Sequence, residues 1–291
     1  MRLPFVSIIV PAYNCEKIIA ECIPSLLNQN YPKNKYEVVV VDNNSKDKTS
    51  EIVKSFSVKY LFETIQSSYA ARNKGIKHAK GKIITFTDAD CIASKNWLKD
   101  GIKAFNDKSI GCVGGQVKSY KPKNYVEEYL ANKKDLSLKF SDKLPYPKTA
   151  NAFYRKEVFD KIGLFEQKWV SGGDADLAWR MQSETDYKVK LAPNAIVYHK
   201  HRSDIKSLFK QCIRWGVGNS LLRKKYPDLV NNYDLRQKLW VFQKFLLSAP
   251  IIFAFLVSNK KSMTKKELTK RLDIITFMGW EFGKVIGRII K

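Results

Sequence analysis

The chain has 291 residues, with 52 Lys and Arg against 28 Asp and Glu, so its formal net charge is +24. A hydrophobic content of 44% excludes a disordered polycation, and a chain of this length builds a core without disulfides or a structural metal. Residues 200–291 hold 20 of the basic and 6 of the acidic side chains, which indicates a polyanionic partner: nucleic acid, an anionic membrane surface or a phosphorylated substrate. A Lys-rich composition that serves only solubility is the alternative.

The first 90 residues alternate between apolar β-branched runs and stretches with helical periodicity. The predicted strands are Val6–Val10, Tyr36–Val41, Val58–Phe62 and Lys82–Thr87. The predicted helices between them are Glu16–Asn28, Thr49–Ser57 and Tyr69–Ala79. This order is typical of βαβ units, so we expect an α/β fold with a mostly parallel sheet and helices on both faces. Ligands bind beyond the carboxyl ends of such strands, which predicts a site formed by Pro11–Asn14, Asp42–Asp47 and Asp88–Asp90.

The N-terminus and the cysteines bear on the compartment. The apolar run before Pro11 is too short for a signal peptide and is interpreted as the first strand. The five cysteines show no Cys-x-x-Cys or Cys-x-x-His spacing, which favours buried thiols in a reducing compartment over disulfides or a zinc site. We therefore expect the catalytic part to be cytoplasmic.

The alternation weakens after residue 110. The elements predicted there are a strand at Ile110–Tyr120, a helix at Tyr125–Phe140, a loop at Leu144–Pro147, a strand at Ala152–Arg155, helices at Lys156–Ile162 and Asp174–Thr185, and strands at Lys188–Ala192 and Ala195–His199. From Ile205 onward the pattern is helical and basic. We expect a catalytic domain over residues 1–220 and a basic, helical C-terminal appendage over residues 221–291.

Two carboxylates, Asp88 and Asp90, follow the fourth predicted strand. Residues two apart in extended backbone face the same way and can converge on one cation. Such oxygen ligands suit Mg²⁺ or Mn²⁺. Water molecules and a substrate diphosphate usually complete the coordination of these ions. A plain surface turn is the alternative. Asp42 ends the second strand, where it could accept hydrogen bonds from a base or a ribose, or else cap a turn. Asp47 fits a structural cap better.

Asp174 and Asp176 open a predicted helix behind two glycines. The helix dipole favours ionised carboxylates there, so a base towards an acceptor hydroxyl is one interpretation and ordinary capping is the other. His199 and His201 leave the last predicted strand on one side, where an imidazole could bind a metal. A histidine without a ligand is the plainer interpretation of this pair.

Six segments, in this order, resemble the family 2 glycosyltransferases, which have the GT-A fold. They are Val6–Asn14, Val41–Asp47, Ala71–Gly75, Asp88–Asp90, Gly173–Arg180 and His199, and the resemblance covers about residues 4–220. The Gly173–Arg180 segment has a glycine where the family usually has Glu before its catalytic Asp. Gln211–Trp215 also resembles the Gln-x-x-Arg-Trp segment of membrane-bound polymerising members, although a basic amphipathic helix would have the same sequence.

The resemblance implies an inverting transfer of a sugar from a nucleoside-diphosphate donor, with UDP as the expected nucleotide, to a hydroxyl of a glycan or lipid-linked acceptor. The donor-binding residues that it implies are Pro11, Ala12, Tyr13, Asn14, Asp42, Arg72 and Asp88. It implies a divalent metal, Mg²⁺ or Mn²⁺, at Asp90 and His199, and a catalytic base at Asp174. Contacts to the acceptor or the diphosphate are implied for Asp176, Arg214 and Trp215.

Two apolar segments lie in the basic C-terminal region. Leu239–Val257 contains an uninterrupted apolar stretch too short for a spanning helix, and Leu272–Ile290 is amphipathic. Apolar segments flanked by lysines suit a helix that lies in the interface of an anionic bilayer, so we expect a peripheral protein on the inner face of the cell membrane. A helical appendage packed on the catalytic domain and a re-entrant hairpin are the alternatives.

Three other functions would account for part of the sequence. A nucleic-acid-binding protein would account for the charge, but no nucleic-acid motif or stacking-aromatic pattern is present, so we expect no nucleic-acid partner. A nucleotidyltransferase would need a Gly-rich, basic loop after the first strand, which Pro11–Asn14 lacks. A donor-binding protein without catalysis has the same motifs as the enzyme, and only turnover separates the two.

Overall fold

Eight strands form the central sheet of the first of two compact units. The computed structural model describes residues 3–133, 138–140, 144–230, 243 and 264–289. The first unit comprises Met1–Lys121 with Lys134–His201, and the second comprises Pro122–Lys133 with Arg202–Lys291. The predicted boundary at residue 220 falls inside helix α8 (Ile205–Lys225).

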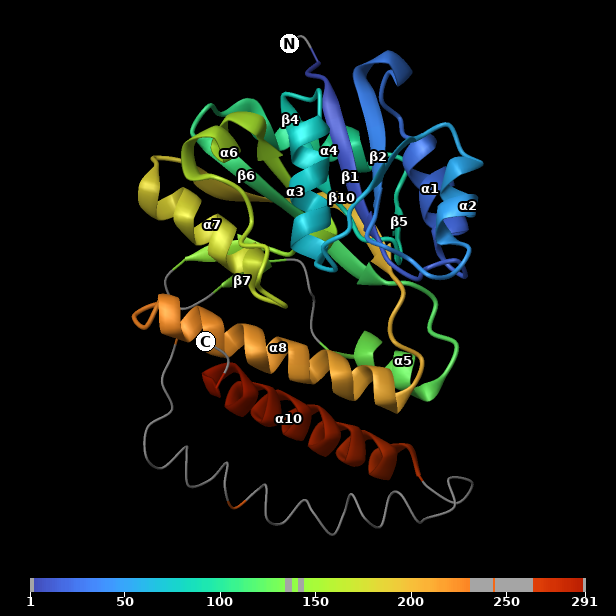
Figure 1. Cartoon of the computed structure of the whole chain (residues 1–291), viewed down its shortest axis with the longest axis vertical. Coiled ribbons are helices and arrows are strands. Elements are labelled where there is room, and N and C mark those ends of the chain that lie inside the picture. The colour runs from blue at the N-terminus through green and yellow to red at the C-terminus, as the bar shows by residue number, and fades with distance from the viewer. Residues whose placement is uncertain (1–2, 134–137, 141–143, 231–242, 244–263, 290–291) are drawn as a thin grey trace. The chain divides into compact units, whose positions relative to one another are not determined.

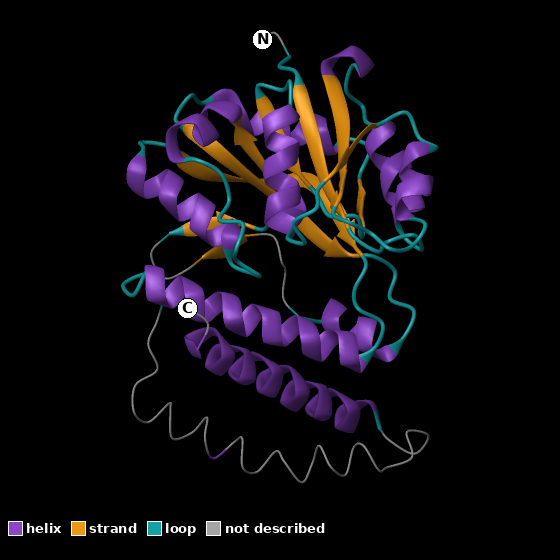
Figure 2. Ribbon diagram, in the orientation of Figure 1, coloured by secondary structure: helices purple, strands orange, loops and turns teal. Residues whose placement is uncertain are grey.

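The sheet of the first unit is mixed, with a parallel half and an antiparallel insertion (Figures 1 and 2). Its order is β3 (Lys59–Phe62), β2 (Tyr36–Asp42), β1 (Val6–Ala12), β4 (Ile83–Phe86), β9 (Ala152–Arg155), β6 (Ile110–Ser119), β10 (Lys188–His199) and β5 (Cys91–Ala93). Strands β3, β2, β1 and β4 are parallel, as predicted. β9 is antiparallel to β4 and β6, and β5 is antiparallel to β10.

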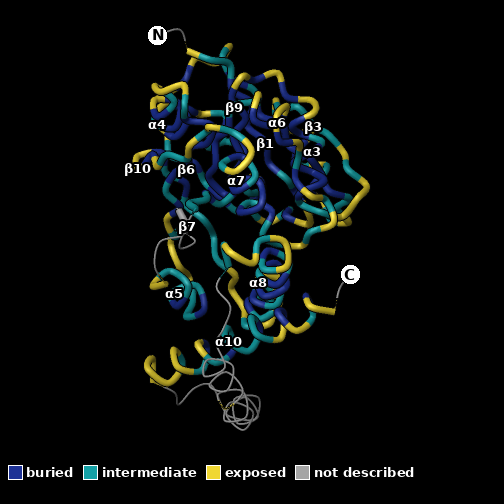
Figure 3. Tube along the Cα trace, turned by 90° about the vertical axis from the view of Figure 1, so that its left-hand side faces the viewer, coloured by how far each residue is buried: buried dark blue, intermediate teal, exposed yellow. Residues whose placement is uncertain are grey.

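Each face of the sheet buries its own apolar cluster, because successive side chains of β1 and β2 point to opposite faces. Ile8 and Val10 join α1 (Ile19–Leu27), α2 (Thr49–Lys54) and α4 (Trp97–Lys103) in one cluster. Ile9 and Val39 join α3 (Ser68–His78), α6 (Lys156–Ile162) and α7 (Gly173–Glu184) in the other. Strands β1 and β2 are therefore buried along almost their whole length, and buried segments of the first unit are dark blue in Figure 3.

Three short strands were not predicted. The helix predicted over Tyr125–Phe140 is wrong in its second half, because α5 ends at Ala131 and β7 (Leu138–Phe140) pairs with β8. The predicted loop at Leu144–Pro147 is wrong as well, because β8 (Pro145–Pro147) lies there. The two strands predicted at the end of the first unit are one strand, β10, with a register shift between Ala192 and Ile196 against β6.

In the second unit, α8 packs against α10 (Lys265–Ile289) along a seam of small residues. The seam consists of Cys212, Gly216 and Ser220 on α8 and of Gly279, Gly283 and Gly287 on α10. A Cβ atom at Gly283 would lie 2.1 Å from the carbonyl oxygen of Ile213, and one at Gly216 would lie 2.1 Å from that of Trp280. The two backbones are therefore in contact, which only glycine allows at these positions.

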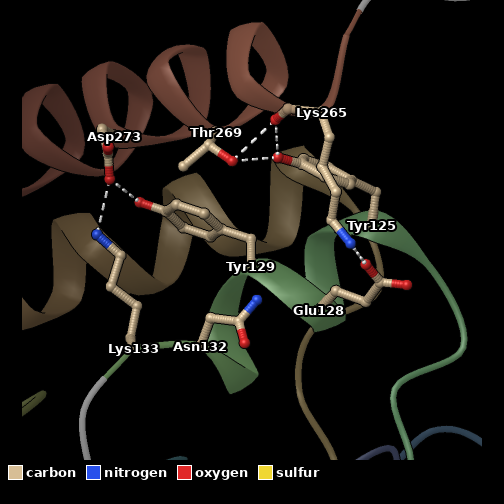
Figure 4. A pocket seen from close by; sticks show the side chains of 8 residues that line it. All are labelled: Tyr125, Glu128, Tyr129, Asn132, Lys133, Lys265, Thr269 and Asp273. Atoms are coloured by element: carbon tan, nitrogen blue, oxygen red, sulfur yellow. Dashed lines mark hydrogen bonds and ion pairs between the residues drawn. The ribbon is translucent and has the colours of Figure 1, made fainter.

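Helix α5 (Tyr125–Ala131) is fastened to α10 around a cavity of about 250 Å³ (Figure 4). The Tyr129 hydroxyl donates to Asp273 Oδ1 at 2.7 Å, and Lys133 Nζ lies 2.8 Å from the same oxygen. At the other end, Lys265 pairs with Glu128 at 2.8 Å. Each charged residue that lines the cavity pairs with one of opposite sign, so the cavity is part of the structural contact between α5 and α10.

Among the described residues, no helix has the length and apolar character needed to cross a membrane. The amphipathic segment predicted at Leu272–Ile290 falls in α10. The apolar segment Leu239–Val257 lies outside the described residues apart from residue 243.

Candidate active site

The loops after β1 and β2 are joined to each other at the carboxyl edge of the sheet. The two strands are in register with Ala12 opposite Asp42, and the Asn43 N–H donates to the Ala12 carbonyl at 2.7 Å. Asn14, in the left-handed region with φ of 45°, donates its N–H to Ser45 Oγ at 3.0 Å. Of the four predicted donor residues in the first loop, Ala12 is buried, Pro11 is half-buried, and Tyr13 and Asn14 are exposed.

Asp42 is buried at the end of β2 with both carboxylate oxygens engaged. Oδ1 accepts the Ser45 N–H at 3.0 Å, and Oδ2 accepts the Tyr60 hydroxyl at 3.0 Å. These bonds fix the carboxylate at the strand end, where a contact with the nucleotide base or ribose was predicted. Each oxygen keeps a second lone pair that can accept a further hydrogen bond. Asp47 serves the structural use assigned to it: although burial opposes it, hydrogen bonds from Thr49 and Glu16 lower the pKa of its carboxyl.

Arg72 of α3 forms an ion pair with Asp88, the first residue of the triplet predicted to bind a metal. Arg72 Nη2 lies 2.6 Å from Asp88 Oδ1, and the Arg72 side chain is only 4% exposed. Ser67 caps the start of α3 by accepting the N–H groups of Tyr69 and Ala70. Arg72 Nε is buried and has no hydrogen-bond partner in the described part of the chain. A buried guanidinium N–H without an acceptor is costly, so this donor is suited to an oxygen of a bound anion.

Asp90 and His199 meet where β5 pairs with the end of β10. His199 Nε2 lies 3.5 Å from Asp90 Oδ1, and the Lys200 N–H donates to the Asp90 carbonyl at 2.9 Å. His199 Nδ1 is buried, and no partner for it occurs among the residues that the structure describes. His201 Nε2 lies 2.7 Å from Ser119 Oγ, and burial, with the charge of His199, lowers the pKa of His201 to about 4.

The donor set at this point fits a divalent cation that a substrate helps to hold. The residues described contain no group of three or more His, Cys, Asp or Glu side chains arranged for a metal. One carboxylate and one imidazole supply two ligands, and Mg²⁺ or Mn²⁺ in nucleotide sites takes the rest from water and phosphate oxygens. Nε2, the nitrogen of His199 that lies 3.5 Å from Asp90 Oδ1, is the one placed to share a cation with that carboxylate.

Asp174 lies in the first turn of α7, which follows Gly172 at a φ of 88°. The Gly173 N–H donates to the Tyr69 hydroxyl at 2.9 Å, and Asp174 Oδ1 accepts the Ala175 N–H at 3.0 Å. Burial raises the pKa of Asp174 above its ordinary value. The charges of Lys148 and Arg72 and the hydrogen bond from Ala175 act in the opposite direction. A carboxyl with a raised pKa is a better proton acceptor than a fully solvated one.

Asp176, two residues further on, faces the protein interior. Its side chain is 0% exposed and pairs with Arg180 at 3.0 Å, and Arg180 also donates to the Leu164 carbonyl at 2.8 Å. These contacts anchor α7 to the segment before it. The predicted contact of Asp176 with acceptor or diphosphate is not favoured by a side chain without exposed surface.

The other two predicted acceptor residues, Arg214 and Trp215, belong to α8 in the second unit. Trp215 is 37% exposed. Their predicted contacts with the substrates stay predictions. The structure also shows two contributors that the sequence did not indicate, namely Tyr60, which holds Asp42, and Tyr69, which accepts the Gly173 N–H. Neither lies in a spaced motif, and only their three-dimensional partners identify them.

Residues 7–163 match the sequence model of a family described as glycosyl transferase family 2. The glycosyltransferase AglE of Haloferax volcanii is 34% identical over 291 aligned residues, which cover 96% of this chain and 92% of that protein. The chain belongs to glycosyl transferase family 2. This confirms the predicted family and makes the protein a glycosyltransferase.

A further family 2 relative is known from Methanococcus voltae. It is a dolichyl N-acetyl-alpha-D-glucosaminyl phosphate 3-beta-D-2,3-diacetamido-2,3-dideoxy-beta-D-glucuronosyltransferase, 27% identical, and the match covers 87% of this chain and 83% of that protein.

Two solved structures share the fold. The mannosyltransferase PcManGT of Pyrobaculum calidifontis, in complex with GDP-Man and Mn²⁺, has a TM-score of 0.66 at 19% identity, and the match covers 98% of this chain and 88% of that one. Staphylococcus aureus TarS, in complex with UDP-GlcNAc, has a TM-score of 0.56 at 20% identity, with coverages of 98% and 92%. They confirm the predicted GT-A-type α/β architecture.

Proposed function

We propose that the protein is an inverting glycosyltransferase that moves a sugar from a nucleoside-diphosphate donor, with UDP as the nucleotide, to an acceptor hydroxyl. The observation that carries this proposal is the link between α7 and α3: the Gly173 N–H beside Asp174 donates to the Tyr69 hydroxyl at 2.9 Å, and Arg72 on the same helix as Tyr69 pairs with Asp88 at 2.6 Å. It joins the base candidate on α7 to the charged groups at the donor edge of the sheet. Direct displacement of the nucleoside diphosphate from the anomeric carbon requires a proton acceptor close to the site that holds the diphosphate.

In this proposal the donor lies across the carboxyl ends of β1, β2 and β4. Asp42, fixed by Tyr60 and Ser45, accepts from the base or the ribose, and Tyr13 and Asn14 flank it. The unpartnered Arg72 Nε donates to a diphosphate oxygen. Asp90 and His199 would hold Mg²⁺ or Mn²⁺, which offsets the charge that develops on the departing diphosphate.

Asp174 takes the proton of the acceptor hydroxyl while the acceptor oxygen attacks the anomeric carbon. As the new C–O bond forms, the bond between that carbon and the diphosphate oxygen breaks, and the nucleoside diphosphate leaves with the electron pair. One displacement at the anomeric carbon inverts its configuration. The Ala175 N–H holds Asp174 Oδ1, so the second oxygen of the carboxylate is the one suited to the proton.

We also propose that the acceptor is lipid-linked and that the second unit binds an anionic membrane from the cytoplasmic side. The exposed residues Phe282, Val285 and Ile289 form one apolar row on α10, 50%, 51% and 75% exposed. Lysines and arginines accompany them in a segment with 20 basic and 6 acidic residues. The relative from M. voltae, which is named for a dolichyl-phosphate-linked substrate, adds support.

Replacement of the base tests the proposed chemistry. We expect Asp174→Asn to lower kcat by roughly 10²–10⁴-fold, because an amide cannot accept the proton, while donor binding survives. A panel of nucleotide sugars with Mn²⁺ first identifies the donor by thermal shift, since a bound ligand raises the melting temperature by mass action.

The Asp174→Asn protein should show the same shift with that donor. Asp160→Asn, an exposed carboxylate on α6, is the matched control and should leave kcat unchanged. Full turnover by Asp174→Asn would contradict the assignment of the base, and a product with retained configuration would contradict the single displacement.

A further inference from the structure

Helix α3 carries a buried asparagine that the proposed chemistry does not use. Asn73 is 2% exposed and follows Arg72, the residue paired with Asp88. Its side chain binds the backbone of Phe165, which lies 92 residues further along the chain. Asn73 Nδ2 donates to the Phe165 carbonyl at 2.8 Å, and Asn73 Oδ1 accepts the Phe165 N–H at 3.0 Å. One side chain therefore satisfies both backbone polar groups of a buried residue.

This pair of hydrogen bonds explains why a carboxamide stands at position 73. A buried N–H needs an acceptor and a buried carbonyl needs a donor, and leaving either group without a partner is costly. A carboxamide supplies a donor and an acceptor side by side, whereas an apolar side chain of any size supplies neither. The Phe165 ring adds to the contact, because it stacks on Tyr69 of the same helix. Asn73 is thus committed to Phe165, which lies in the segment that leads to α7.

The residue before Phe165 is bound by α7. Arg180 of α7 donates to the Leu164 carbonyl at 2.8 Å and to the Ile162 carbonyl. Since Arg180 also pairs with Asp176 at 3.0 Å, its guanidinium is held against its own helix. Two consecutive residues are therefore tied to two different helices, Leu164 to α7 and Phe165 to α3. We call this pair the bridge.

A second link joins α3 and α7 where α7 begins. Tyr69 lies one helical turn before Asn73, and its hydroxyl accepts the Gly173 N–H at 2.9 Å. Asp174 is the next residue along the chain. The bridge holds α7 at Arg180, nearly two turns further on, so the two links are separated along the axis of α7. Together they fix the position and the direction of α7 relative to α3, whereas the Gly173 contact alone fixes only its start.

We propose that Asn73 is a positioning residue, which holds the base Asp174 in place by fixing the bridge and with it the direction of α7. The inference rests on the proposed function, because it takes Asp174 as the base. Without the two hydrogen bonds to Phe165, the bridge stays attached to α7 but loses its tie to α3, so α7 can tilt and carry Asp174 away from the acceptor hydroxyl. A shift of about 1 Å in a catalytic group can slow a reaction by a factor of about 100.

Hydrogen exchange followed by mass spectrometry tests the structural step without any need for turnover. We expect Asn73→Ala to accelerate exchange over residues 163–173 roughly tenfold, because the Phe165 N–H loses its acceptor and the segment loses its tie to α3. Alanine favours a helix more than asparagine does, so α3 itself should exchange no faster. Lys77→Ala, at an exposed position of α3, is the matched control and should leave residues 163–173 unchanged. Unchanged exchange over these residues in Asn73→Ala would overturn the proposal.

Kinetics separate a positioning role from a purely structural one. At a temperature at which the variants are fully folded, we expect Asn73→Ala to lower kcat roughly 10- to 100-fold while the donor KM changes by less than about twofold. Asn73→Leu, which is similar in size but forms neither hydrogen bond, should lose as much activity.

Three kinetic outcomes would overturn the proposal. An unchanged kcat in Asn73→Leu would mean that the side chain only fills space, and a raised donor KM with an unchanged kcat would mean that it serves the donor site. Failure of both variants to fold would assign Asn73 to stability instead. Absence of transfer by the unmodified protein would contradict the proposed function, whereas the exchange experiment is independent of turnover.

Discussion

Gly173 meets two requirements at the residue scale. A Cβ atom there would lie 2.7 Å from the Tyr69 ring, which is held in place by stacking on Phe165 with centroids 5.5 Å apart. The Tyr69 hydroxyl also accepts the Gly173 N–H, so the same ring excludes a side chain and satisfies the backbone. Gly173, which stands where the family usually has Glu, therefore leaves room for the Tyr69 ring. The contact between the two residues fixes the start of α7 and with it the position of Asp174.

Gly173→Ala should therefore harm catalysis more than stability. The Tyr69 ring must shift by a few tenths of an ångström or more, which costs about 1–3 kcal/mol in a packed site and displaces Asp174, the proposed base, next to it. We expect kcat to fall roughly 10- to 100-fold with a modest loss in melting temperature. Steady-state kinetics and thermal unfolding measure both. Ser183→Ala, at an exposed position of the same helix, serves as control; equal kcat in the two variants would refute the argument.

The range of each interaction decides which site residues a sequence can reveal. Asp42, Asp88 and Asp90 were predicted because a polar residue directly after a buried strand is a local pattern. Tyr60 and Tyr69 meet partners 18 and 104 residues away, and neither carries a spacing signal. The placement of Leu144 and Pro145 was unpredictable for the same reason, since their hydrogen bonds with Trp179 and Gln182 of α7 exist only after folding.

At the element scale, the seam between α8 and α10 brings two helix backbones into direct contact. Glycines at positions 279, 283 and 287 recur every four residues, which places them on one face of α10. They meet Cys212, Gly216 and Ser220, which have the same spacing on α8. Near the seam, Lys284 is 3% exposed and pairs with Glu281 at 3.0 Å, so its buried charge is compensated.

Gly283→Ala should open this seam. Alanine normally favours a helix over glycine by about 1 kcal/mol, but here its Cβ would lie 2.1 Å from a backbone carbonyl that cannot rotate away. We expect hydrogen exchange of the α10 amides to accelerate roughly tenfold or more, which mass spectrometry can follow. Lys270→Ala, an exposed position on the same helix, should slow exchange or leave it unchanged. Slower exchange in Gly283→Ala would count against the close approach.

The length of an element decides whether the sequence predicted it. The strands of the first 90 residues and helices α6 and α7 are long or periodic enough to be recognised, and the structure confirms them. β5, β7 and β8 have three residues each, too few for an alternation to be visible. These short strands form only because a partner strand pairs with them. The predicted helix was therefore extended to Phe140, through residues that form β7.

At the scale of the whole molecule, residues 200–291 carry +14 of the net charge of +24, and α10 within them exposes an apolar row. Basic residues near an anionic bilayer contribute about 1 kcal/mol each, and this attraction weakens as salt rises. An exposed apolar row adds burial that salt does not weaken. The two contributions are therefore separable by experiment.

Flotation with liposomes measures both. We expect the protein to float with vesicles that contain anionic lipid, to float less at high salt, and to stay at the bottom with neutral vesicles. Replacing Phe282, Val285 and Ile289 by Ser should lower the bound fraction severalfold on anionic vesicles at every salt concentration. Phe62→Ser, at an exposed apolar position of β3, is the matched control. If the protein floats with neither kind of vesicle, membrane binding is contradicted, and the basic residues serve solubility alone.

Backbone-to-backbone packing between α8 and α10 does not draw its strength from the exclusion of water. Helices joined by large apolar side chains lose much of their attraction in hydrocarbon, because lipid tails solvate those side chains equally well. Close contacts between glycine backbones rest on dispersion and shape, which are similar in both media. The contacts at Gly279, Gly283 and Gly287 should therefore change little between an aqueous and a more apolar environment, whereas the packing of Leu208 against Leu272 and Ile275 depends on water.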